Sequence, residues 1–266
     1  MAAEALLDWY EEVRRPLPWR FTRDPWAILV SEVMLQQTQA ARVVPRYERV
    51  LARYPAPEAL AAAPAADAIA AWSGLGYNRR VLALRAAARV VAEAGWPPPE
   101  ALETLPGVGP YTAAALGSFG WDAPMAAVDT NVRRVIERRD GVRRGPKALA
   151  RRAAELLPEG RAAAWNQAMM ELGATVCLAR RPSCGACPLR PGCAGPEALT
   201  APADPRRAAR EPFEATDRWA RGRVLAALVE GEALPALAPE RRERALAGLE
   251  RDGLVVRGPD GEPRLP

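Results

Sequence analysis

Histidine is absent from the 266 residues of this chain. Its absence excludes a histidine general acid or base, histidine metal ligands and Ser–His or Cys–His nucleophilic schemes. Lysine is almost absent as well, because Lys147 is the only one among the 37 basic residues. Proton transfer must therefore depend on carboxylates, on tyrosines or on that single lysine.

Aromatic residues make up only 6% of the chain, although hydrophobic residues reach 49%. This content supports a core, and the alanine-rich segments favour closely packed helices. No apolar run approaches the roughly 20 residues of a membrane span. The amphipathic, acidic N-terminal segment is unlike a secretory signal. We therefore expect no membrane partner and a cytoplasmic location, where the net charge of +5 suits a polyanionic partner without identifying it.

Cysteine is scarce, and all four cysteines lie within one stretch of seventeen residues. Their spacing is Cys177-x6-Cys184-x2-Cys187-x5-Cys193. Four thiolates grouped in this way can fill the protein-ligand positions of an iron–sulfur cluster. A zinc site is an alternative, but such sites usually have two short-spaced pairs of ligands, and two disulfides would require an oxidising compartment. The spacing favours a [4Fe–4S] cluster.

The pattern of apolar residues predicts an all-α fold up to about residue 195, followed by a linker and a small module. Helices are predicted over 3–15, 25–38, 44–54, 101–120 (with a glycine turn inside), 128–139, 147–157 and 162–177, and two more end at Gly76 and Gly95. Residues 196–215 are rich in Pro, Ala and Arg, which is typical of a linker. Residues 216–266 read as two helices and a hairpin around Pro259–Gly261. This order resembles a small winged-helix module, with a helical tail packed on the main domain as the alternative.

The segment from Leu105 to Thr112, LPGVGPYT, lies between two predicted helices. Gly107, Val108 and Gly109 form a tight turn in it, and glycines at this spacing expose backbone N–H groups at a helix N-terminus, where phosphate oxygens bind. An ordinary helix–helix turn is the alternative. The full run LPGVG-x-x-TA is more specific, because it resembles the helix–hairpin–helix of DNA repair glycosylases. A cysteine loop of this spacing follows the catalytic domain in those enzymes.

The resemblance extends over residues 8–195. The matching segments are SEVMLQQTQ, WSGLGY, LPGVG, VDTNVRRV and NQAMMELGA, which resemble the adenine DNA glycosylases of the MutY type. The resemblance implies a glycosylase domain over 1–195 with two helical lobes, one of about 24–128 and the other of 1–23 plus 129–195. It also implies that the four cysteines hold a [4Fe–4S] cluster that braces the protein on DNA.

Two carboxylates carry the chemistry that this family implies. Glu32 matches the general acid, and burial in its apolar helix should raise its pKa. Asp129 matches the carboxylate that stabilises the sugar cation, although its sequence context also suits a helix cap. Asn131 and Tyr111 match residues that orient Asp129 and line the base pocket. A surface glutamate is the alternative for Glu32.

Tyr111 stands where strand-cleaving relatives have a nucleophilic lysine, and Lys147 lies outside the motif, so the enzyme should be monofunctional. Gln36, Gln37 and Thr38 match residues that contact the opposing base and its neighbours. Tyr77 matches a wedge residue, with core packing beside Trp72 as the alternative. The chain departs from the family in having Asn78 after Tyr77.

A second departure from the family concerns the residues after the cysteines. They do not resemble the C-terminal Nudix-like domain of many family members, whose recognition loop bears a histidine.

These observations together predict a monomeric DNA glycosylase of base excision repair. It flips and hydrolytically excises adenine that is mispaired with 8-oxoguanine or guanine in double-stranded DNA. The alternatives are a thymine or other mismatch glycosylase of the same superfamily and a non-catalytic iron–sulfur DNA-binding protein.

Overall fold

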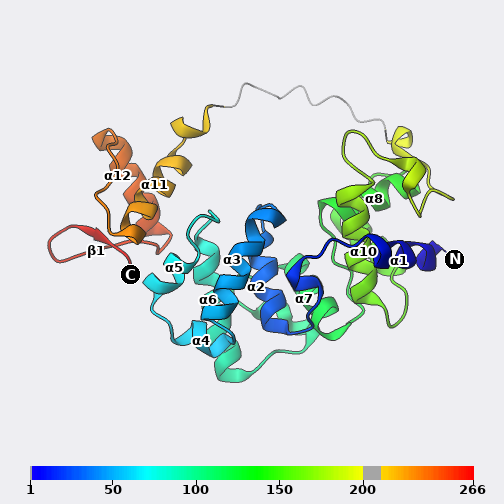
Figure 1. Ribbon diagram of the computed structural model, residues 1–266, viewed down its shortest axis with the longest axis horizontal. Helices are drawn as coiled ribbons and strands as arrows, with labels where there is room; N and C mark the ends of the chain where they lie inside the picture. Colours follow the sequence, from blue (N-terminus) through cyan, green and yellow to red (C-terminus); the bar gives the residue numbers. More distant parts are fainter. Residues whose placement is uncertain (1, 200–210) are drawn as a thin grey trace. The chain divides into compact units, whose positions relative to one another are not determined.

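Among the described residues, the regular secondary structure is helical except for one two-stranded hairpin near the C-terminus (Figure 1). The structure, a computed structural model, describes residues 2–199 and 211–266. The α-helices are α1 Ala2–Val13, α2 Pro25–Leu35, α3 Ala40–Arg53, α4 Pro57–Ala62, α5 Ala65–Ala71, α6 Arg79–Ala94, α7 Pro110–Trp121, α8 Thr130–Asp140, α9 Pro146–Glu155, α10 Ala162–Thr175, α11 Asp217–Glu230 and α12 Pro239–Arg251. The predicted all-α fold is confirmed.

Three predicted helix boundaries are wrong by three residues or more. The helix predicted to end at Gly76 ends at Ala71, because the chain turns from Trp72 onward. The helix predicted over 25–38 ends at Leu35, because Gln37 has a φ of 57° and turns the chain. The helix predicted over 44–54 begins earlier, at Ala40, and contains Pro45 in its interior. Proline removes only one intrahelical hydrogen bond near a helix start, so the apolar face of α3 keeps the helix intact.

The described residues divide into two compact units. The first is formed from Met1–Glu32, Trp96–Thr104 and Val108–Asp204, and the second from Val33–Gly95, Leu105–Gly107 and Pro205–Pro266. These units are not the predicted lobes, so the predicted lobe boundaries stay a prediction. The sequence-predicted linker falls mainly on residues 200–210, which lie outside the described residues.

The core of the first unit is built by α1, α8 and α10, with help from α9. Its buried side chains include Leu6, Tyr10, Ile136, Trp165 and Leu172. Each helix contributes apolar residues three or four positions apart, so one stripe of each faces the others. This packing fixes the start of α8, where a predicted catalytic carboxylate lies.

The second unit contains α3 to α6 and the residues from 211 onward. Buried residues such as Tyr47, Leu60, Trp72 and Leu84 lie within it. In its C-terminal part α11 packs against α12, and β1 (Val256–Arg257) pairs antiparallel with β2 (Pro263–Arg264). The predicted order of two helices and a hairpin is therefore confirmed.

The residues from 211 onward also contact α5 and α6 within the second unit. The Ala66 N–H donates to the Pro266 carbonyl at 3.1 Å, and Arg79 forms an ion pair with Asp252 at 3.6 Å.

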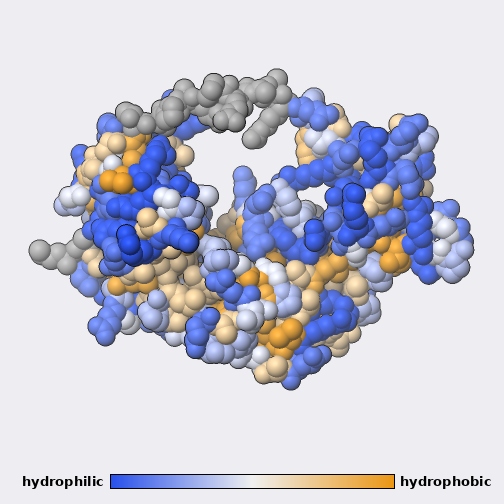
Figure 2. All heavy atoms as spheres, turned by 180° about the vertical axis from the view of Figure 1, so that it is seen from behind, coloured by the Kyte–Doolittle hydropathy of each residue, from blue (hydrophilic) through white to orange (hydrophobic). Residues whose placement is uncertain are grey.

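Hydrophilic side chains cover most of the face drawn in Figure 2, and apolar ones lie in small separate groups. Single large apolar side chains are exposed in both units, for example Phe21 and Phe213. None of the helices in the described part of the chain has the length and apolar character needed to cross a membrane.

Candidate active site

Glu32 lies in the last turns of α2, among residues that are almost all apolar. The residue is 5% exposed, and burial raises its pKa to about 7, because a charged carboxylate loses hydration there. A hydrogen bond from Tyr111 works against this shift, and the charge of Asp129 adds to it. A carboxyl with a pKa near neutrality exists in both protonation states at physiological pH, as a general acid requires.

Tyr111 reaches Glu32 because of the turn that precedes α7. Gly107 has a φ of 76°, and a side chain there would meet the Ala83 Cβ at 2.6 Å, so only glycine fits. Pro110 then starts α7, and Tyr111 follows in its first turn. The Tyr111 hydroxyl donates to Glu32, and burial and the nearby carboxylates raise the pKa of Tyr111 well above its usual range. Oε2 of Glu32 is buried with no hydrogen-bond partner among the described residues, and a protonated carboxyl can donate from this oxygen.

Asp129 caps the N-terminus of α8, as its sequence context predicts. Its Oδ1 accepts from the Asn131 N–H at 2.9 Å and from the Val132 N–H at 2.7 Å. Its Oδ2 accepts from Nδ2 of Asn131 at 2.8 Å. Three N–H donors and the positive end of the helix dipole thus surround this carboxylate. The predicted orienting role of Asn131 agrees with this geometry.

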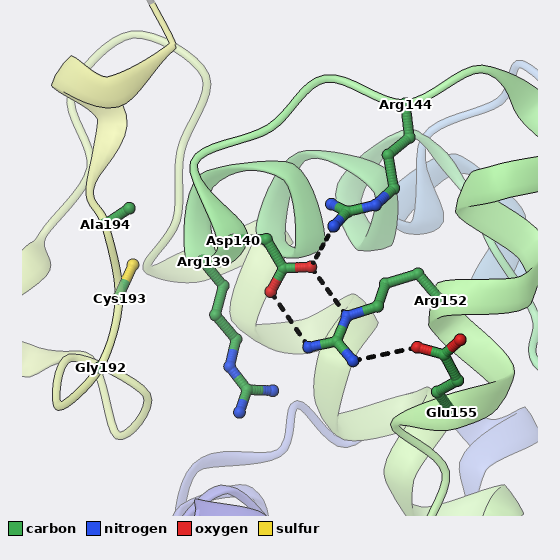
Figure 3. Close-up of a pocket in the computed structure, with 8 residues that line it drawn as sticks. All are labelled: Arg139, Asp140, Arg144, Arg152, Glu155, Gly192, Cys193 and Ala194. Atoms are coloured by element: carbon green, nitrogen blue, oxygen red, sulfur yellow. Dashed lines mark hydrogen bonds and ion pairs between the residues drawn. The ribbon is translucent and has the colours of Figure 1, made fainter.

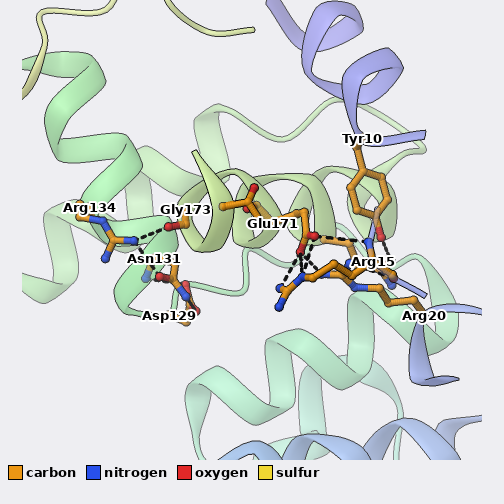
Figure 4. A network of polar contacts seen from close by, with 10 residues as sticks. Tyr10, Arg15, Arg20, Asp129, Asn131, Arg134, Glu171 and Gly173 are labelled. Carbon is orange, nitrogen blue, oxygen red and sulfur yellow. Dashed lines mark hydrogen bonds and ion pairs between the residues drawn. The ribbon is translucent and has the colours of Figure 1, made fainter. Parts of the chain in front are cut away.

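Asn131 also contacts Gly173 and Arg134 (Figure 4). A Cβ on Gly173 would lie 2.5 Å from the Asn131 Cβ, so glycine is needed for α10 to approach α8 this closely. Nη2 of Arg134 donates to Oδ1 of Asn131 at 2.7 Å and to the Gly173 carbonyl at 2.6 Å, and its Nε donates to the Cys177 carbonyl at 2.7 Å. Both the Oδ1 and the Nδ2 of Asn131 are therefore hydrogen-bonded, to Arg134 and Asp129 respectively. Through Arg134 the backbone of Cys177 belongs to the same hydrogen-bond network.

The four cysteines are free thiols of intermediate burial. Burial raises the pKa of the Cys187 thiol, a backbone hydrogen bond from Leu189 opposes this, and the charges of the other three thiolates raise it again. The four sulfurs are thus near enough to interact, and all are the soft ligands that iron–sulfur clusters take.

The loop that carries the cysteines is held from α8. Arg138 donates to the carbonyls of Leu178 at 2.7 Å and Ala179 at 2.8 Å, and the Ala194 N–H donates back to the Arg139 carbonyl. No three His, Cys, Asp or Glu side chains in the described ranges gather closely enough for a single metal ion. A four-iron cluster is wider than one ion and holds its four thiolates further apart. The donor set fits such a cluster.

An open pocket of about 640 Å³ adjoins the loop at Cys193 (Figure 3). Asp140 lies at its wall, bonded by Arg152 at 2.8 Å and by Arg144 at 2.9 Å. Burial raises the pKa of Asp140, but these arginines outweigh it and the net shift is downward. None of the predicted catalytic residues lines this pocket. We therefore interpret its ion pairs as structural contacts next to the cysteine loop.

Gln36, Gln37, Thr38 and Tyr77 belong to the second unit, and the predicted catalytic residues belong to the first. Gln37 and Tyr77 have φ values of 57° and 47°, a region that non-glycine residues rarely adopt. Tyr77 is 39% exposed, whereas Trp72 is fully buried. Core packing therefore does not account for Tyr77, and its contact with DNA stays a prediction.

Two arginines that organise these segments, Arg80 and Arg134, were not predicted from the sequence. Arg80 bonds the carbonyls of Val33 and Gln36, more than forty residues away. Arg134 bonds Asn131 in its own helix, but it also bonds the carbonyls of Gly173 and Cys177, which are remote in the sequence. Only the tertiary structure identifies these two among the many arginines.

Comparison with known proteins agrees with this geometry. A family model described as HhH-GPD superfamily base excision DNA repair protein matches residues 30–159. An adenine DNA glycosylase of Mycobacterium tuberculosis is 43% identical over 98% of this chain and 92% of its own length. The human adenine DNA glycosylase is 40% identical over 71% of this chain and 38% of its own.

Among solved structures, a thermostable thymine-DNA glycosylase aligns with a TM-score of 0.67 and 32% identity. The alignment covers 72% of this chain and 93% of that one. By the extent and identity of these matches, and by the two carboxylates that its fold brings together, this chain belongs to the adenine DNA glycosylases of the HhH-GPD superfamily.

Proposed function

We propose that the protein is a monofunctional glycosylase that removes mispaired adenine from double-stranded DNA in base excision repair. The observation that carries this proposal is the environment of Glu32. This carboxyl is buried, has a pKa raised to about 7, and lies beside Tyr111 and the charge of Asp129. Its relatives named adenine DNA glycosylase support adenine as the base.

The first step is protonation of the base by Glu32. Adenine is a poor leaving group as an anion, so a ring nitrogen must take a proton before the N-glycosidic bond breaks. The buried Oε2 of Glu32, which lacks a partner among the described residues, supplies this proton, and Tyr111 holds the other end of the carboxyl. Neutral adenine then leaves with both bonding electrons.

Asp129 stabilises the sugar that remains. Loss of the base gives C1′ oxocarbenium character, and a nearby carboxylate lowers the energy of that cation. Asp129 is held in one orientation by Asn131 and by the start of α8, so it need not reorganise during the reaction. Water then attacks C1′ and its proton passes to the Glu32 carboxylate that the first step left, which restores the acid and leaves an abasic site.

The position of Tyr111 supports a purely hydrolytic enzyme. A lyase requires an amine that forms a Schiff base at C1′. The residue that meets Glu32 is a phenol, and Lys147 lies at the start of α9. We therefore expect the strand to stay intact after the base is released.

Cys177, Cys184, Cys187 and Cys193 would hold a [4Fe–4S] cluster in this proposal. When bound, the cluster would hold the cysteine loop in shape and would supply a redox-active group to the protein. Arg180, Arg181 and Arg190 in and beside this loop would face DNA phosphates. The gap left by the flipped base would be filled by Gln36, Gln37, Thr38 and Tyr77. The turn from Gly107 to Gly109 would bind the DNA phosphate backbone. One chain carries all the proposed catalytic residues, which supports action as a monomer. Because the proposed substrate is DNA, the enzyme would act at the nucleoid of the cytoplasm.

A substrate panel tests the proposal. Duplexes with A·8-oxoguanine, A·G and G·T pairs are incubated with the enzyme, and abasic sites are revealed by alkali. We expect alkali-labile product from the two adenine duplexes, little from G·T, and no cleavage before alkali. Intact adenine in duplexes that the enzyme binds would contradict the proposal.

A thymine or mismatch glycosylase is the second candidate, because the thymine-DNA glycosylase is similar in structure and sequence over most of its length. Greater product from G·T than from A·G in the same panel would favour it. Tight DNA binding with no product from any duplex would instead favour a non-catalytic DNA-binding protein.

A further inference from the structure

Arg80, in the first turn of α6, makes an unusually large set of contacts. Its Nη1 donates to the carbonyls of Val33 at 2.7 Å, Met34 at 2.9 Å and Gln36 at 2.6 Å. Its Nη2 donates to the Gly76 carbonyl at 2.9 Å and to Oγ1 of Thr38 at 3.3 Å. One guanidinium thus joins two segments that are remote in the sequence, 33–38 and 75–77.

The carbonyls that Arg80 bonds include those at the end of α2. The last carbonyls of a helix have no partner within the helix, and a cation there also interacts favourably with the helix dipole. The rigid fork of a guanidinium serves several such oxygens at once, whereas an ammonium group acts as a single point charge. Arginine is therefore the side chain that this position requires.

Both segments hold a residue in an unfavourable backbone conformation. Gln37 and Tyr77 are two of the three non-glycine residues with positive φ in the described residues. Such conformations persist only where the surroundings enforce them, and they concentrate at functional sites. The contacts of Arg80 with Gln36, Thr38 and Gly76 lie directly next to these two residues.

Aromatic rings complete the surroundings of Arg80. Its guanidinium carbon lies 5.5 Å from the centre of the buried Trp72 ring and 5.6 Å from that of the Tyr77 ring. Burial lowers the pKa of Arg80 to about 10, because the charged guanidinium loses hydration there. A partly desolvated cation with this many fixed partners leaves little freedom to the segments around it.

We infer that Arg80 is a positioning residue that sets 33–38 and 75–77 in their DNA-reading arrangement before DNA arrives. In this inference Arg80 acts through those two segments, because its hydrogen bonds are made to them. A reading surface that is already ordered loses less entropy on binding and so transfers more of its contact energy to opening the duplex. The inference rests on the proposed function, because that function places Gln36 to Thr38 and Tyr77 against DNA.

The test compares two adenine duplexes under single-turnover conditions. Both contain an A·G pair, with normal neighbours in one and mispaired, easily unstacked neighbours in the other. We expect Arg80→Lys to slow excision about tenfold in the first duplex and to stay within about twofold of wild type in the second, where opening costs less. Arg85→Lys is the matched control, since Arg85 lies on the same helix and its Nε donates to the Ala63 carbonyl at 2.8 Å, away from both segments.

Amide hydrogen exchange gives a readout that does not depend on activity. In Arg80→Lys the amides of 33–38 and 75–77 should exchange faster, while those of α10 keep the wild-type rate. An equal loss of excision in both duplexes, or unchanged exchange in both segments, would overturn the inference. Unfolding of Arg80→Lys and of Arg80→Gln at the assay temperature would overturn it too, because Arg80 would then hold the whole unit.

The two levels of failure are separable. Wild-type enzyme that releases no adenine from either duplex removes the proposed function and this inference with it. Wild-type enzyme that excises adenine, together with an Arg80→Lys variant that matches it in both duplexes, removes this inference alone.

Discussion

Glu32 and Glu171 are both glutamates buried in helices of the first unit, and their ionisation is opposite. Glu32 in α2 accepts one hydrogen bond from a phenol, and burial raises its pKa to about 7. Burial acts on Glu171 in α10 as well, but hydrogen bonds from Arg15 and Arg20 outweigh it and lower its pKa to about 2. The comparison shows that burial raises the pKa of a carboxyl that has only a phenol as partner, whereas two arginine partners overcome burial and keep the carboxyl charged.

The two glutamates accordingly do different work. Glu171 accepts from Nη2 of Arg15 at 2.7 Å and from Nη2 of Arg20 at 2.5 Å, which ties the segment after α1 to α10 (Figure 4). Its charge is fully neutralised and unavailable for chemistry. Glu32 retains an oxygen with no partner among the described residues and a proton to give.

The largest difference should appear in excision of adenine. Glu32→Gln keeps the shape but has no acidic proton, so we expect the single-turnover rate to fall by about a thousandfold. Glu171→Gln should stay within about twofold of wild type at a temperature where it is folded, since it contacts no predicted catalytic residue. Comparable losses in the two variants would remove the distinction between them.

Stability should separate the pair in the opposite sense. Glu171→Gln leaves the buried Arg20 without its charged partner, so we expect a loss of about 3 kcal/mol in the free energy of unfolding. For a chain of this size the melting temperature would fall by roughly 10 °C. The check is thermal unfolding at pH 8, and a melting temperature within about 2 °C of wild type would contradict the expectation.

The pH dependence of the two glutamates should also be opposite. The pKa of Glu32 is raised in the folded state, so the stability linked to its proton is present below about pH 4.5 and is lost as the pH rises through 7. Wild type should lose about 2–3 kcal/mol between pH 5 and 8 on this account, and Glu32→Gln should not. The pKa of Glu171 is lowered, so its contribution is present above pH 4.5 and is lost as the pH falls toward 2.

The rate of excision should fall above pH 7, since the acidic form of Glu32 is the reactive one. Denaturant unfolding at pH 5, at pH 8 and below pH 4 measures the change in the free energy of unfolding. Single-turnover kinetics over the same range measures the excision rate. A rate that rises steadily from pH 6 to 9 would show that Glu32 does not act as the acid.

The smallest effect is expected for an exposed glutamate, Glu4. It forms an ion pair with Arg161 at 2.8 Å, and both side chains are about half exposed. Water and salt screen such pairs, so Glu4→Gln should change the free energy of unfolding by less than about 1 kcal/mol. A loss as large as that of Glu171→Gln would show that burial does not explain the comparison.

The sequence predicted much of the fold because its signals are local. Apolar periodicity, glycines and prolines placed the helices, and Asp-Thr-Asn at 129–131 predicted the cap of α8. The sequence-based prediction was wrong at the end of α2, because glutamine at position 37 is not a residue type that usually ends a helix. The carbonyls freed there are bonded by Arg80, more than forty residues away.

The sequence by itself determined the family, the all-α fold and the residue types available for chemistry. Without histidine, proton transfer was left to carboxylates, tyrosines and a single lysine. The tertiary structure alone decided which of the two buried glutamates holds a proton, because that depends on surroundings made by folding: burial among apolar residues for Glu32 and two arginines for Glu171. Charge in a protein interior is a property of the surroundings, and a linear sequence does not contain them.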